Sequence, residues 1–161
     1  MPSKQSSSSN INQDLIYERS RVTFSVLKLT HLLDGGPEKT ARRRYLESLI
    51  ERDPTGVFSN EDNRYLHRSD RHVRALAKHV RLVEICRSIG VGSEPGAAYP
   101  GEIVLSPDFY TLVASVADEL PTALHWIMFI PNILSLCDEE QQNRWLPLCR
   151  DWRMIGCVSI A

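Results

Sequence analysis

Basic residues recur every three or four positions between residues 64 and 81, a spacing that places side chains on one face of an α-helix. Six basic residues against one acidic residue give this stretch a local charge of +5. Such a face can bind phosphate groups, as in nucleic-acid recognition, or it can form salt bridges at a surface or between domains. The basic residues are Arg64, Arg68, Arg71, Arg74, Lys78 and Arg81.

The surroundings of this basic face favour salt bridges. No regular interleaving of aromatic residues accompanies the arginines, which single-strand binding would need. The whole chain carries a formal net charge of −1, so it is not steered toward nucleic acid or an anionic membrane. We therefore expect no nucleic-acid partner. The same helix has an apolar face elsewhere on its surface, formed by Leu66, Val73, Leu76, Val80 and Val83.

Histidines and cysteines also carry chemistry, but their spacing does not suit a metal site. His67, His72 and His79 do not form i, i+4 ligand pairs, so we expect them to be solvated or to cap a helix. The four cysteines lack C-x-x-C spacing, which predicts reduced and mostly buried thiols. They are Cys86, Cys137, Cys149 and Cys157. No arrangement of nucleophile, base and acid is visible in the residues alone.

Two other patterns only partly resemble phosphate sites. Arg42, Arg43 and Arg44 are consecutive, so on a helix they point in three directions and are expected to be solvated. Residues 90–101, GVGSEPGAAYPG, do not match G-x-G-x-x-G and follow a predicted helix rather than a strand. We interpret this segment as a loop.

Apolar spacing predicts helices along most of the chain. The expected fold is all-α, with about six helices, ending in the start of a strand at Met154–Ile160. Glycine and proline supply boundaries: Gly35–Gly36 ends a helix, Pro37 starts the next, and Ser106–Pro107 starts another. The expected helices span about 23–33, 37–53, 60–89, 106–120 and 124–136, and a last one begins at Asp138.

The last helix has the clearest start signal. Asp138 and Gln141 have the spacing of a capping box, while Pro147 is expected to kink or end the helix. The preceding segment, residues 124–136, is nearly all apolar, but it contains a histidine, a proline and an asparagine. It also ends before the roughly 20 residues that a membrane span requires. We expect a core helix and no membrane span.

Two blocks of sequence resemble the N-terminal helical domain of the peroxisomal acyl-CoA oxidases. One follows the family pattern M-F-x-P-x-L-L, then x-E-Q-Q-x-R-W-L-P, then I-I-G. The other follows L-D-G-G-x-x-x-T-x-x-R-R-x-x-E-x-x-I-x-x-D-P. The likeness covers about residues 19–156. The matching residues are Met128, Phe129, Pro131, Leu134, Glu140, Gln141, Gln142, Arg144, Trp145, Leu146, Pro147, Ile155 and Gly156, and Leu33–Gly36, Thr40, Arg42–Arg44, Glu47, Ile50, Asp53 and Pro54.

This resemblance implies a flavoprotein oxidoreductase family of lipid metabolism. Its members use FAD to remove two hydrogens across the Cα–Cβ bond of an acyl-CoA, and oxygen then reoxidises the flavin to give hydrogen peroxide in fatty acid β-oxidation. A carboxylate base takes the α-proton while the flavin accepts hydride. The implied architecture is an N-terminal helical domain, a middle β-domain and C-terminal helical bundles, usually in a dimer.

The chain departs from the family pattern where the flavin contacts begin. The family strand reads x-Y-A-Q-T-E after the glycine, whereas this chain has Cys157–Ala161, with Ala161 at the threonine position. The resemblance places the catalytic base in C-terminal helices that this sequence does not include. We therefore assign no catalytic, cofactor-binding or metal-binding residue, and we expect no FAD to be bound by this chain alone. A truncated isoform, an alternative final exon and a degenerate gene fragment remain open interpretations.

Two functions follow from these observations. The chain belongs to an acyl-CoA oxidase system but is not catalytic alone; or it is a non-catalytic helical module that binds a full-length oxidase or another partner. In the second case the face that the β-domain covers in the family is exposed. We expect this apolar patch around Trp126–Leu136 and Met154–Ile160.

The domain boundaries and the location are expectations as well. Residues 1–18 are a polar leader expected to be disordered, and residues 19–161 are the helical domain. The resemblance implies a peroxisomal location. Ser159–Ala161 lacks the basic middle residue of an S-K-L address, so a cytoplasmic location is the alternative.

Overall fold

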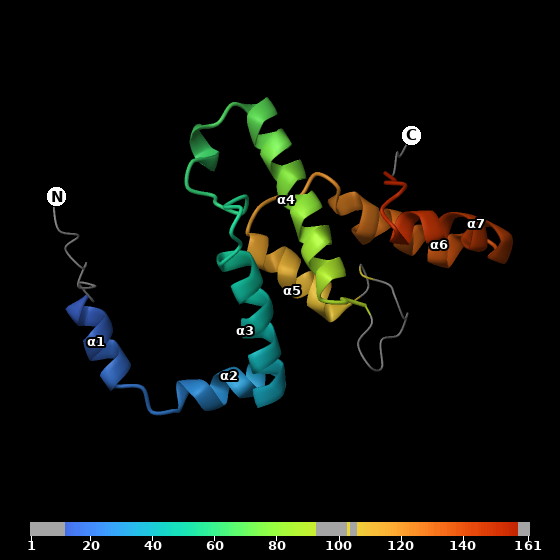
Figure 1. The fold of residues 1–161 in the computed structure, drawn as a ribbon. Helices are drawn as coiled ribbons and strands as arrows, with labels where there is room; N and C mark the ends of the chain where they lie inside the picture. Colours follow the sequence, from blue (N-terminus) through green and yellow to red (C-terminus); the bar gives the residue numbers. More distant parts are fainter. Residues whose placement is uncertain (1–11, 93–102, 104–105, 158–161) are drawn as a thin grey trace. The chain divides into compact units, whose positions relative to one another are not determined.

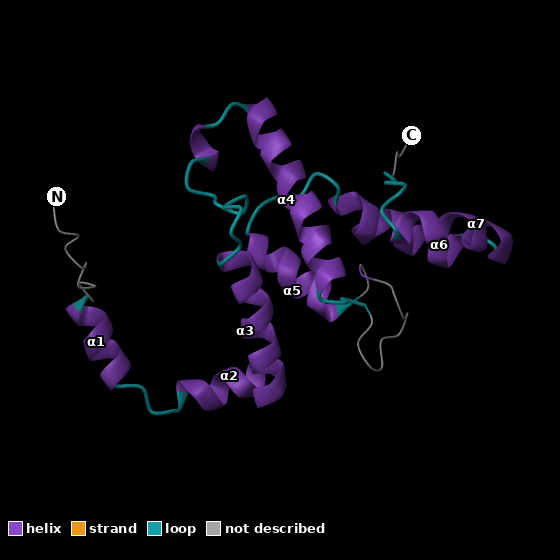
Figure 2. Ribbon diagram, viewed as in Figure 1, coloured by secondary structure: helices purple, strands orange, loops and turns teal. Residues whose placement is uncertain are grey.

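Every regular element in the described part of the chain is helical. The computed structural model describes residues 12–92, 103 and 106–157. Within these residues it contains seven α-helices, labelled in Figure 1, and no strand, as Figure 2 shows. The predicted all-α class is confirmed, with one helix more than the expected six.

The chain divides into two compact units, residues 1–41 and residues 42–161. The first unit contains α1 (Gln13–Ser20), α2 (Val26–Asp34) and the first turn of α3 (Pro37–Glu51). The division falls within α3. The predicted boundary between a leader of residues 1–18 and a helical domain of residues 19–161 stays a prediction. Residues 13–18 are helical, since α1 spans them, while residues 1–11 lie outside the described part.

Local capping explains the boundaries of α2. The hydroxyl of Ser25 accepts a hydrogen bond from the backbone N–H of Lys28, which starts the helix three residues later than the sequence suggested. Gly35 ends it in the left-handed conformation, with φ of 85°, and the N–H of Gly36 donates to the carbonyl of His31 at 2.6 Å. The predicted glycine stop is therefore confirmed.

The first unit exposes nearly all its large apolar side chains. Neither α1 nor α2 contains a buried residue. The partly buried positions of α2 are instead polar: Thr30, His31 and Asp34. The exposed apolar residues of this unit are Leu15, Ile16, Tyr17, Val22, Phe24, Val26, Leu27, Leu29, Leu32 and Leu33. These helices therefore bury little apolar area, which is the main source of folding free energy.

The second unit has a continuous hydrophobic core. It is built from α3, α4 (Arg68–Ser88), α5 (Pro107–Val116), α6 (Ile130–Leu136) and α7 (Glu139–Arg150). In it α4 packs against α5, and α6 packs against α7. The largest buried apolar side chains are Leu46, Leu82, Phe109, Leu112, Val116, Trp126 and Ile130.

The long helix α4 starts later than predicted. The sequence suggested a start at Asn60, but residues 60–66 form turns that include the short 3₁₀ helix η1 (Asn63–Tyr65). The Nδ1 atom of His67 accepts from the N–H of Ser69 and so caps α4, as expected for a capping histidine. The backbone of Leu66 and His67 is extended, with ψ of 146° and 153°, so the helix begins only at Arg68.

The predicted helix at residues 124–136 contains a π-helical turn. Residues His125–Phe129 form this turn, η3, and α6 continues from Ile130 with Pro131 in its first turn. A proline there is tolerated because the first N–H groups of a helix have no intrahelical acceptor. Short π-helical turns widen a helix locally and often occur at functional positions.

The start of α7 confirms the predicted capping box. The N–H of Gln141 donates to Asp138 Oδ1 at 2.8 Å, and the side-chain oxygen of Gln141 accepts from the N–H of Asp138 at 3.2 Å. Of the two outcomes predicted for Pro147, the end of the helix is wrong, since α7 continues to Arg150, whereas the kink stays a prediction. Pro147 and Asn143 are both exposed, so the carbonyl that loses its intrahelical bond can face water.

The expected strand after α7 is not formed within the described residues. Trp152 adopts φ of 57°, and the N–H groups of Arg153 and Met154 both donate to the carbonyl of Leu148. Residues 155–157 have no regular structure, and residues 158–161 lie outside the described part. A strand needs a neighbouring strand for its hydrogen bonds, and the described residues supply none.

Candidate functional site: a buried lysine network and a histidine–aromatic cluster

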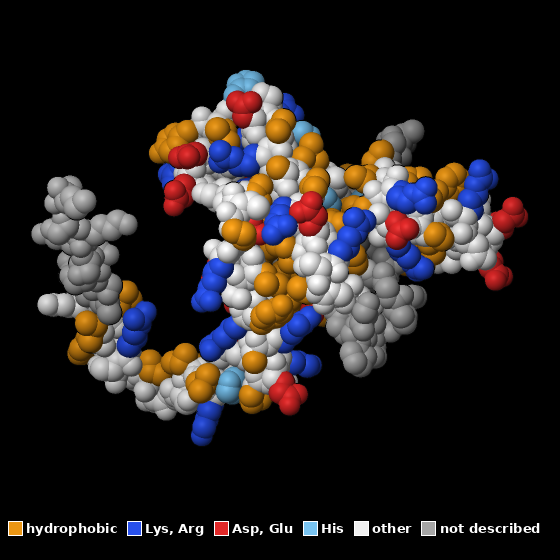
Figure 3. All heavy atoms as spheres, viewed as in Figure 1, with side chains coloured by type: hydrophobic (Ala, Val, Ile, Leu, Met, Phe, Trp, Pro, Cys, Tyr) orange, Lys and Arg blue, Asp and Glu red, His pale blue; other side chains and the backbone are white. Residues whose placement is uncertain are grey.

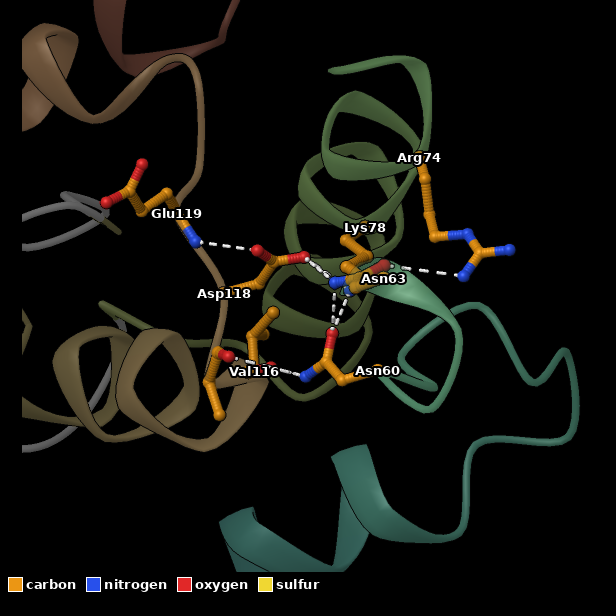
Figure 4. A network of polar contacts seen from close by, with 8 residues as sticks. Asn60, Asn63, Arg74, Lys78, Val116, Asp118 and Glu119 are labelled. Carbon is orange, nitrogen blue, oxygen red and sulfur yellow. Dashed lines mark hydrogen bonds and ion pairs between the residues drawn. The ribbon is translucent and has the colours of Figure 1, made fainter. Parts of the chain in front are cut away.

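A fully buried lysine lies at the centre of a polar network in the second unit. The Lys78 side chain is 0% exposed, and its Nζ lies 2.5 Å from Asp118 Oδ2. Nζ also donates to Asn60 Oδ1. Figure 4 shows these groups converging from α4, from the turn before it and from the loop after α5. The network therefore joins three segments that are distant in the sequence.

Two asparagines complete this network. Asn63 Nδ2 donates to Asp118 Oδ2 at 2.9 Å and to Asn60 Oδ1 at 2.8 Å. Asn60 Nδ2 donates to the carbonyl of Val116 at 3.0 Å, at the end of α5. Arg74 Nη1 approaches Asn63 Oδ1 at 3.3 Å from the solvent side of α4 (Figure 4). Each buried polar group therefore has a partner, as burial of a charge requires.

The electrostatics of Asp118 fit a structural ion pair. Partial burial raises the pKa of this carboxyl, but hydrogen bonds from Lys78 and Asn63 outweigh that effect and hold the pKa below its usual value. The carboxylate and the ammonium thus neutralise one another inside the fold. Both are committed to intramolecular partners, and their bonds hold together α4, the turn before it and the loop after α5.

The burial of Lys78 corrects the prediction that all six basic residues share one salt-bridge face at a surface or between domains. The structure buries a stripe of α4 that contains Ala75, Lys78, His79, Leu82, Val83, Ile85 and Cys86. Lys78 is three residues after Ala75 and four before Leu82, so helical spacing places it on the core side. This spacing relative to Ala75 and Leu82 was the signal in the sequence from which the burial of Lys78 could have been predicted. Nothing near Asp118 in the sequence identified it as the partner.

Two other residues of the predicted basic face have contacts nearer the surface. Arg81 of α4 pairs with Asp53 at 2.8 Å and with Glu84 at 3.1 Å, and the guanidinium of Arg64, in η1, lies over the ring of Tyr65. Partial burial raises the pKa of Asp53, but hydrogen bonds from Thr55 and Arg81 outweigh it and lower the pKa overall. The expectation of salt bridges is confirmed for Arg81. The absence of a nucleic-acid partner stays a prediction.

A second cluster combines two histidines with aromatic rings. His79 stacks on Trp126 with ring centroids 5.2 Å apart and an interplanar angle of 9°, and it lies 4.5 Å from Trp152. His125 lies 4.9 Å from Trp152 and 6.0 Å from Phe129. His79 is buried, so the expectation of a solvated or capping residue is wrong for it. The core of this unit is therefore partly aromatic and partly titratable.

Burial keeps both histidines neutral near pH 7. It lowers the pKa of His79 to about 4, and the charge of nearby His125 adds to the effect. Burial also lowers the pKa of His125, against a smaller opposing effect of its hydrogen bond to the carbonyl of Cys149. No hydrogen-bond partner for the His79 nitrogens is found among the described residues. A buried, neutral ring in an aromatic stack is not poised as a base for an external substrate.

Helix α4 also exposes an apolar stripe. Val73 is 65%, Leu76 37% and Val80 59% exposed, although the sequence grouped them with Val83, which is buried. Figure 3 shows hydrophobic side chains at the surface along this helix. Ile155, after α7, is 55% exposed and lines the same hollow as Val80. We refer to Val73, Leu76, Val80 and Ile155 as the α4 apolar surface.

The apolar patch predicted at residues 126–136 and 154–160 is only partly present. Trp126, Ile130 and Ile133 are buried in the core. Ile127 is 59%, Leu136 79% and Ile155 55% exposed. The difference arises because α6 and the π-helical turn are amphipathic, with one side against α7. Val158–Ile160 lie outside the described residues.

The residues of the E-Q-Q-x-R-W-L-P block have structural contacts. Gln142 Nε2 donates to the carbonyls of Leu134 and Cys137, at 3.2 and 2.9 Å, and so satisfies the end of α6. The guanidinium of Arg144 lies 4.7 Å from the ring of Trp145. Leu146 is buried. In this chain the block holds α6 and α7 together.

The expectation that this chain has no cofactor-binding or metal-binding residue stays a prediction, and two observations on the described residues bear on it. Phosphates are commonly bound at free helix N-termini, but α4, α5 and α7 are capped by the side chains of His67, Ser106 and Asp138. No group of three or more metal-ligating residues occurs among the described residues. Among the cysteines, Cys86 and Cys149 are buried, Cys137 is intermediate and Cys157 is exposed. Ala161, at the family's flavin-contact position, lies outside the described part.

Together these features define an all-helical domain whose polar and aromatic clusters stabilise the fold and whose surface has exposed apolar residues. The sequence pattern of the family described as acyl-coenzyme A oxidase N-terminal matches residues 25–155. The chain belongs to this family.

Known relatives agree with this assignment. The chain is 37% identical over 151 residues to peroxisomal acyl-coenzyme A oxidase 1 of Phascolarctos cinereus, covering 92% of this chain and 21% of that protein. It is 36% identical over 149 residues to the protein of the same name from Rattus norvegicus, covering 92% of this chain and 21% of that protein. The chain therefore spans about a fifth of the length of these relatives.

A solved structure shows the same fold. An acyl-CoA oxidase from Lycopersicon esculentum (tomato) matches with a TM-score of 0.72 and 26% sequence identity, over 89% of this chain and 20% of that one. The resemblance to the N-terminal domain of the acyl-CoA oxidases is confirmed. Among the described helices none is both long and apolar enough to cross a membrane.

Proposed function

We propose that this chain is an acyl-CoA oxidase N-terminal domain that works by docking to the rest of an oxidase and is not catalytic alone. The observation that carries this proposal is the family match over residues 25–155 in a chain that spans only 21% of its relatives. The polar networks of the domain are closed on themselves. A helical domain of this kind contributes surface and shape to a larger enzyme.

The α4 apolar surface supports a docking function. Val73, Leu76 and Val80 lie outside the buried stripe of α4, and Ile155 is the last residue of the family match. In the longer relatives about four-fifths of the protein lies outside the matched part. Exposed apolar area of this kind marks a protein contact. We infer that an oxidase body covers it, either the remainder of the same polypeptide or a separate oxidase chain.

The chemistry proposed for such a complex is that implied by the family. The substrate is an acyl-CoA, the cofactor is FAD, and the reaction is α,β-desaturation with release of hydrogen peroxide. The relatives are named peroxisomal, which supports a peroxisomal location for this chain; a cytoplasmic location is the alternative. The resemblance places the base and the flavin site outside the matched residues, so the proposal assigns both to the oxidase body.

The first experiment is a flavin test on the purified chain. We expect no flavin absorbance after purification or after incubation with FAD, and no peroxide with an acyl-CoA. Bound flavin with turnover would overturn the proposal that the domain is not catalytic alone. A full-length rat oxidase in the same assay is the positive control.

The second experiment tests docking and uses the rat oxidase with its own N-terminal domain removed. We expect this truncated body to bind the chain, measured by sedimentation or calorimetry, and we expect Val80→Asp to weaken the binding at least tenfold. Arg71→Gln, on an exposed part of the same helix, also changes the net charge by −1, so it is the matched charge control and should have a smaller effect. Failure of the wild-type chain to bind a correctly folded oxidase body would contradict the docking proposal.

A further inference from the structure

One buried imidazole connects the end of α7 to the segment that follows it. The His125 side chain is fully buried within the π-helical turn. Its Nδ1 lies 3.1 Å from the backbone nitrogen of Gly156, and its Nε2 lies 3.2 Å from the carbonyl oxygen of Cys149. Both ring nitrogens are thus used, one on each side of the turn that residues 150–155 make.

The two partners determine the tautomer. The amide of Gly156 can only donate, so Nδ1 carries no proton; the carbonyl of Cys149 can only accept, so Nε2 carries one. A neutral ring of this tautomer satisfies both bonds. The pKa of this ring is lowered by burial, and the nearest titratable group in the cluster is His79 of α4.

Packing restricts the same segment from the other side. A Cβ atom on Gly156 would lie 2.0 Å from Cδ1 of Phe129, so the backbone passes directly over that ring. The N–H groups of Arg153 and Met154 both donate to the carbonyl of Leu148, at 3.0 and 3.1 Å. Residues 153–156 are therefore bound to η3 and α7 at three amides. The direction of the chain at Gly156 is set by these bonds.

We propose that His125 is a positioning residue that sets the direction in which the chain leaves the helical domain. Cys157 follows the glycine after which, in the resemblance, the family's flavin-facing strand begins. This proposal rests on the proposed function, in which the exit direction aligns the domain with the oxidase body. The two ring bonds join the π-helical turn to the backbone on both sides of residues 150–155.

Three variants separate the two bonds. In His125→Asn the side-chain oxygen can take the place of Nδ1 and accept from Gly156; in His125→Gln the side-chain amide can take the place of Nε2 and donate to Cys149. His125→Leu keeps neither bond. The measurement is amide hydrogen exchange, residue by residue, on the full 161-residue chain.

We expect protection of the Gly156 amide to fall about tenfold in His125→Gln and His125→Leu, and to be largely kept in His125→Asn. Amides in the middle of α4 and α7 should keep their protection relative to one another. Equal loss of protection across α4, α7 and residues 153–156 in all three variants would overturn the proposal, because it would make His125 a core residue only. So would unchanged Gly156 protection in His125→Leu.

Comparing His125→Gln with His125→Asn in the same exchange experiment covers the case in which His125→Leu unfolds the domain. Gln and Asn differ by one methylene, so the sign of the difference between their Gly156 protections decides the matter even when both variants are less stable. This exchange experiment needs no oxidase and no flavin. It can therefore fail while the docking experiment succeeds, and the reverse is also possible.

Discussion

The Nζ atom of Lys78 and the Oδ2 atom of Asp118 lie 2.5 Å apart, although 40 positions separate these residues in the sequence. The pair connects the middle of α4 to the loop after α5. Lys78 has no exposed surface, whereas the Asp118 side chain is 17% exposed. A buried ion pair of this kind is costly to desolvate, and it persists because Asn60 and Asn63 satisfy the remaining polar atoms.

Removing the ammonium should destabilise the second unit. We expect Lys78→Met to lower the free energy of unfolding by about 3–5 kcal/mol, because it leaves the Asp118 carboxylate without its partner. Urea denaturation followed by circular dichroism measures this change. Arg71→Met, at an exposed position of the same helix, should stay within about 0.5 kcal/mol of the wild type. An equally small effect of Lys78→Met would show that the network does not support the fold.

Removing both charges should cost less than removing one. We expect Lys78→Met with Asp118→Leu to be more stable than Lys78→Met alone, because no buried charge is then unpaired. The coupling between the two sites is obtained from a double-mutant cycle in urea. Additive effects would mean that the two side chains do not interact.

The close approach of Gly156 to Phe129 predicts a steric defect and its suppressor. Gly156→Ala should lower the free energy of unfolding by about 1–3 kcal/mol, because its Cβ would overlap the Phe129 ring. Phe129→Leu should relieve part of that loss in the double variant. Phe129→Leu alone is the control. A fully tolerated Gly156→Ala in thermal melts would contradict this packing.

The buried histidine predicts an acid-sensitive fold. The folded state protonates His79 near pH 4 and the unfolded chain near 6.5, so the unfolded state binds more protons between these values. The stability that neutral His79 contributes is fully present above about pH 6.5, and up to about 3 kcal/mol of it is lost as the pH falls toward 4. His79→Phe should flatten this part of the stability profile, measured by urea denaturation at several pH values. The same substitution at the exposed His72 should leave the slope unchanged.

The side chain of Gln142 should contribute more stability than its exposed neighbour. Gln142→Ala removes both bonds to the end of α6, and we expect a loss of about 1–2 kcal/mol. Gln141→Ala removes one side of the capping box and should cost about 1 kcal/mol. Asn143→Ala, which is exposed on the same helix, is the matched control. Thermal melts that rank Asn143 with Gln142 would contradict the capping role.

Sequence signals predicted the local elements well where the cause is local. The capping box of Asp138 and Gln141, the Gly35 stop and the Ser106 cap all appear as expected, because each depends on atoms within a few residues. The strand expected after Met154 was wrong within the described residues, because strand formation depends on a partner elsewhere. The candidate site was predicted least well, since Asn60, Asn63 and Asp118 meet only through tertiary packing.

Helix α4 shows where the sequence alone was sufficient and where it was not. The sequence predicted a helix over about residues 60–89, of which residues 68–88 form α4, and it predicted that the chain resembles one enzyme family, because helical spacing and short motifs are properties of neighbouring residues. It placed the apolar side chains Leu66, Val73, Leu76, Val80 and Val83 on one face of this helix and the basic side chains on another. Only tertiary structure decided between them: it buried Ala75, Lys78 and Leu82 and left Val73 and Val80 exposed. The physical reason is that a lysine can be buried only where a carboxylate from another segment meets it, and that partner is defined by the fold.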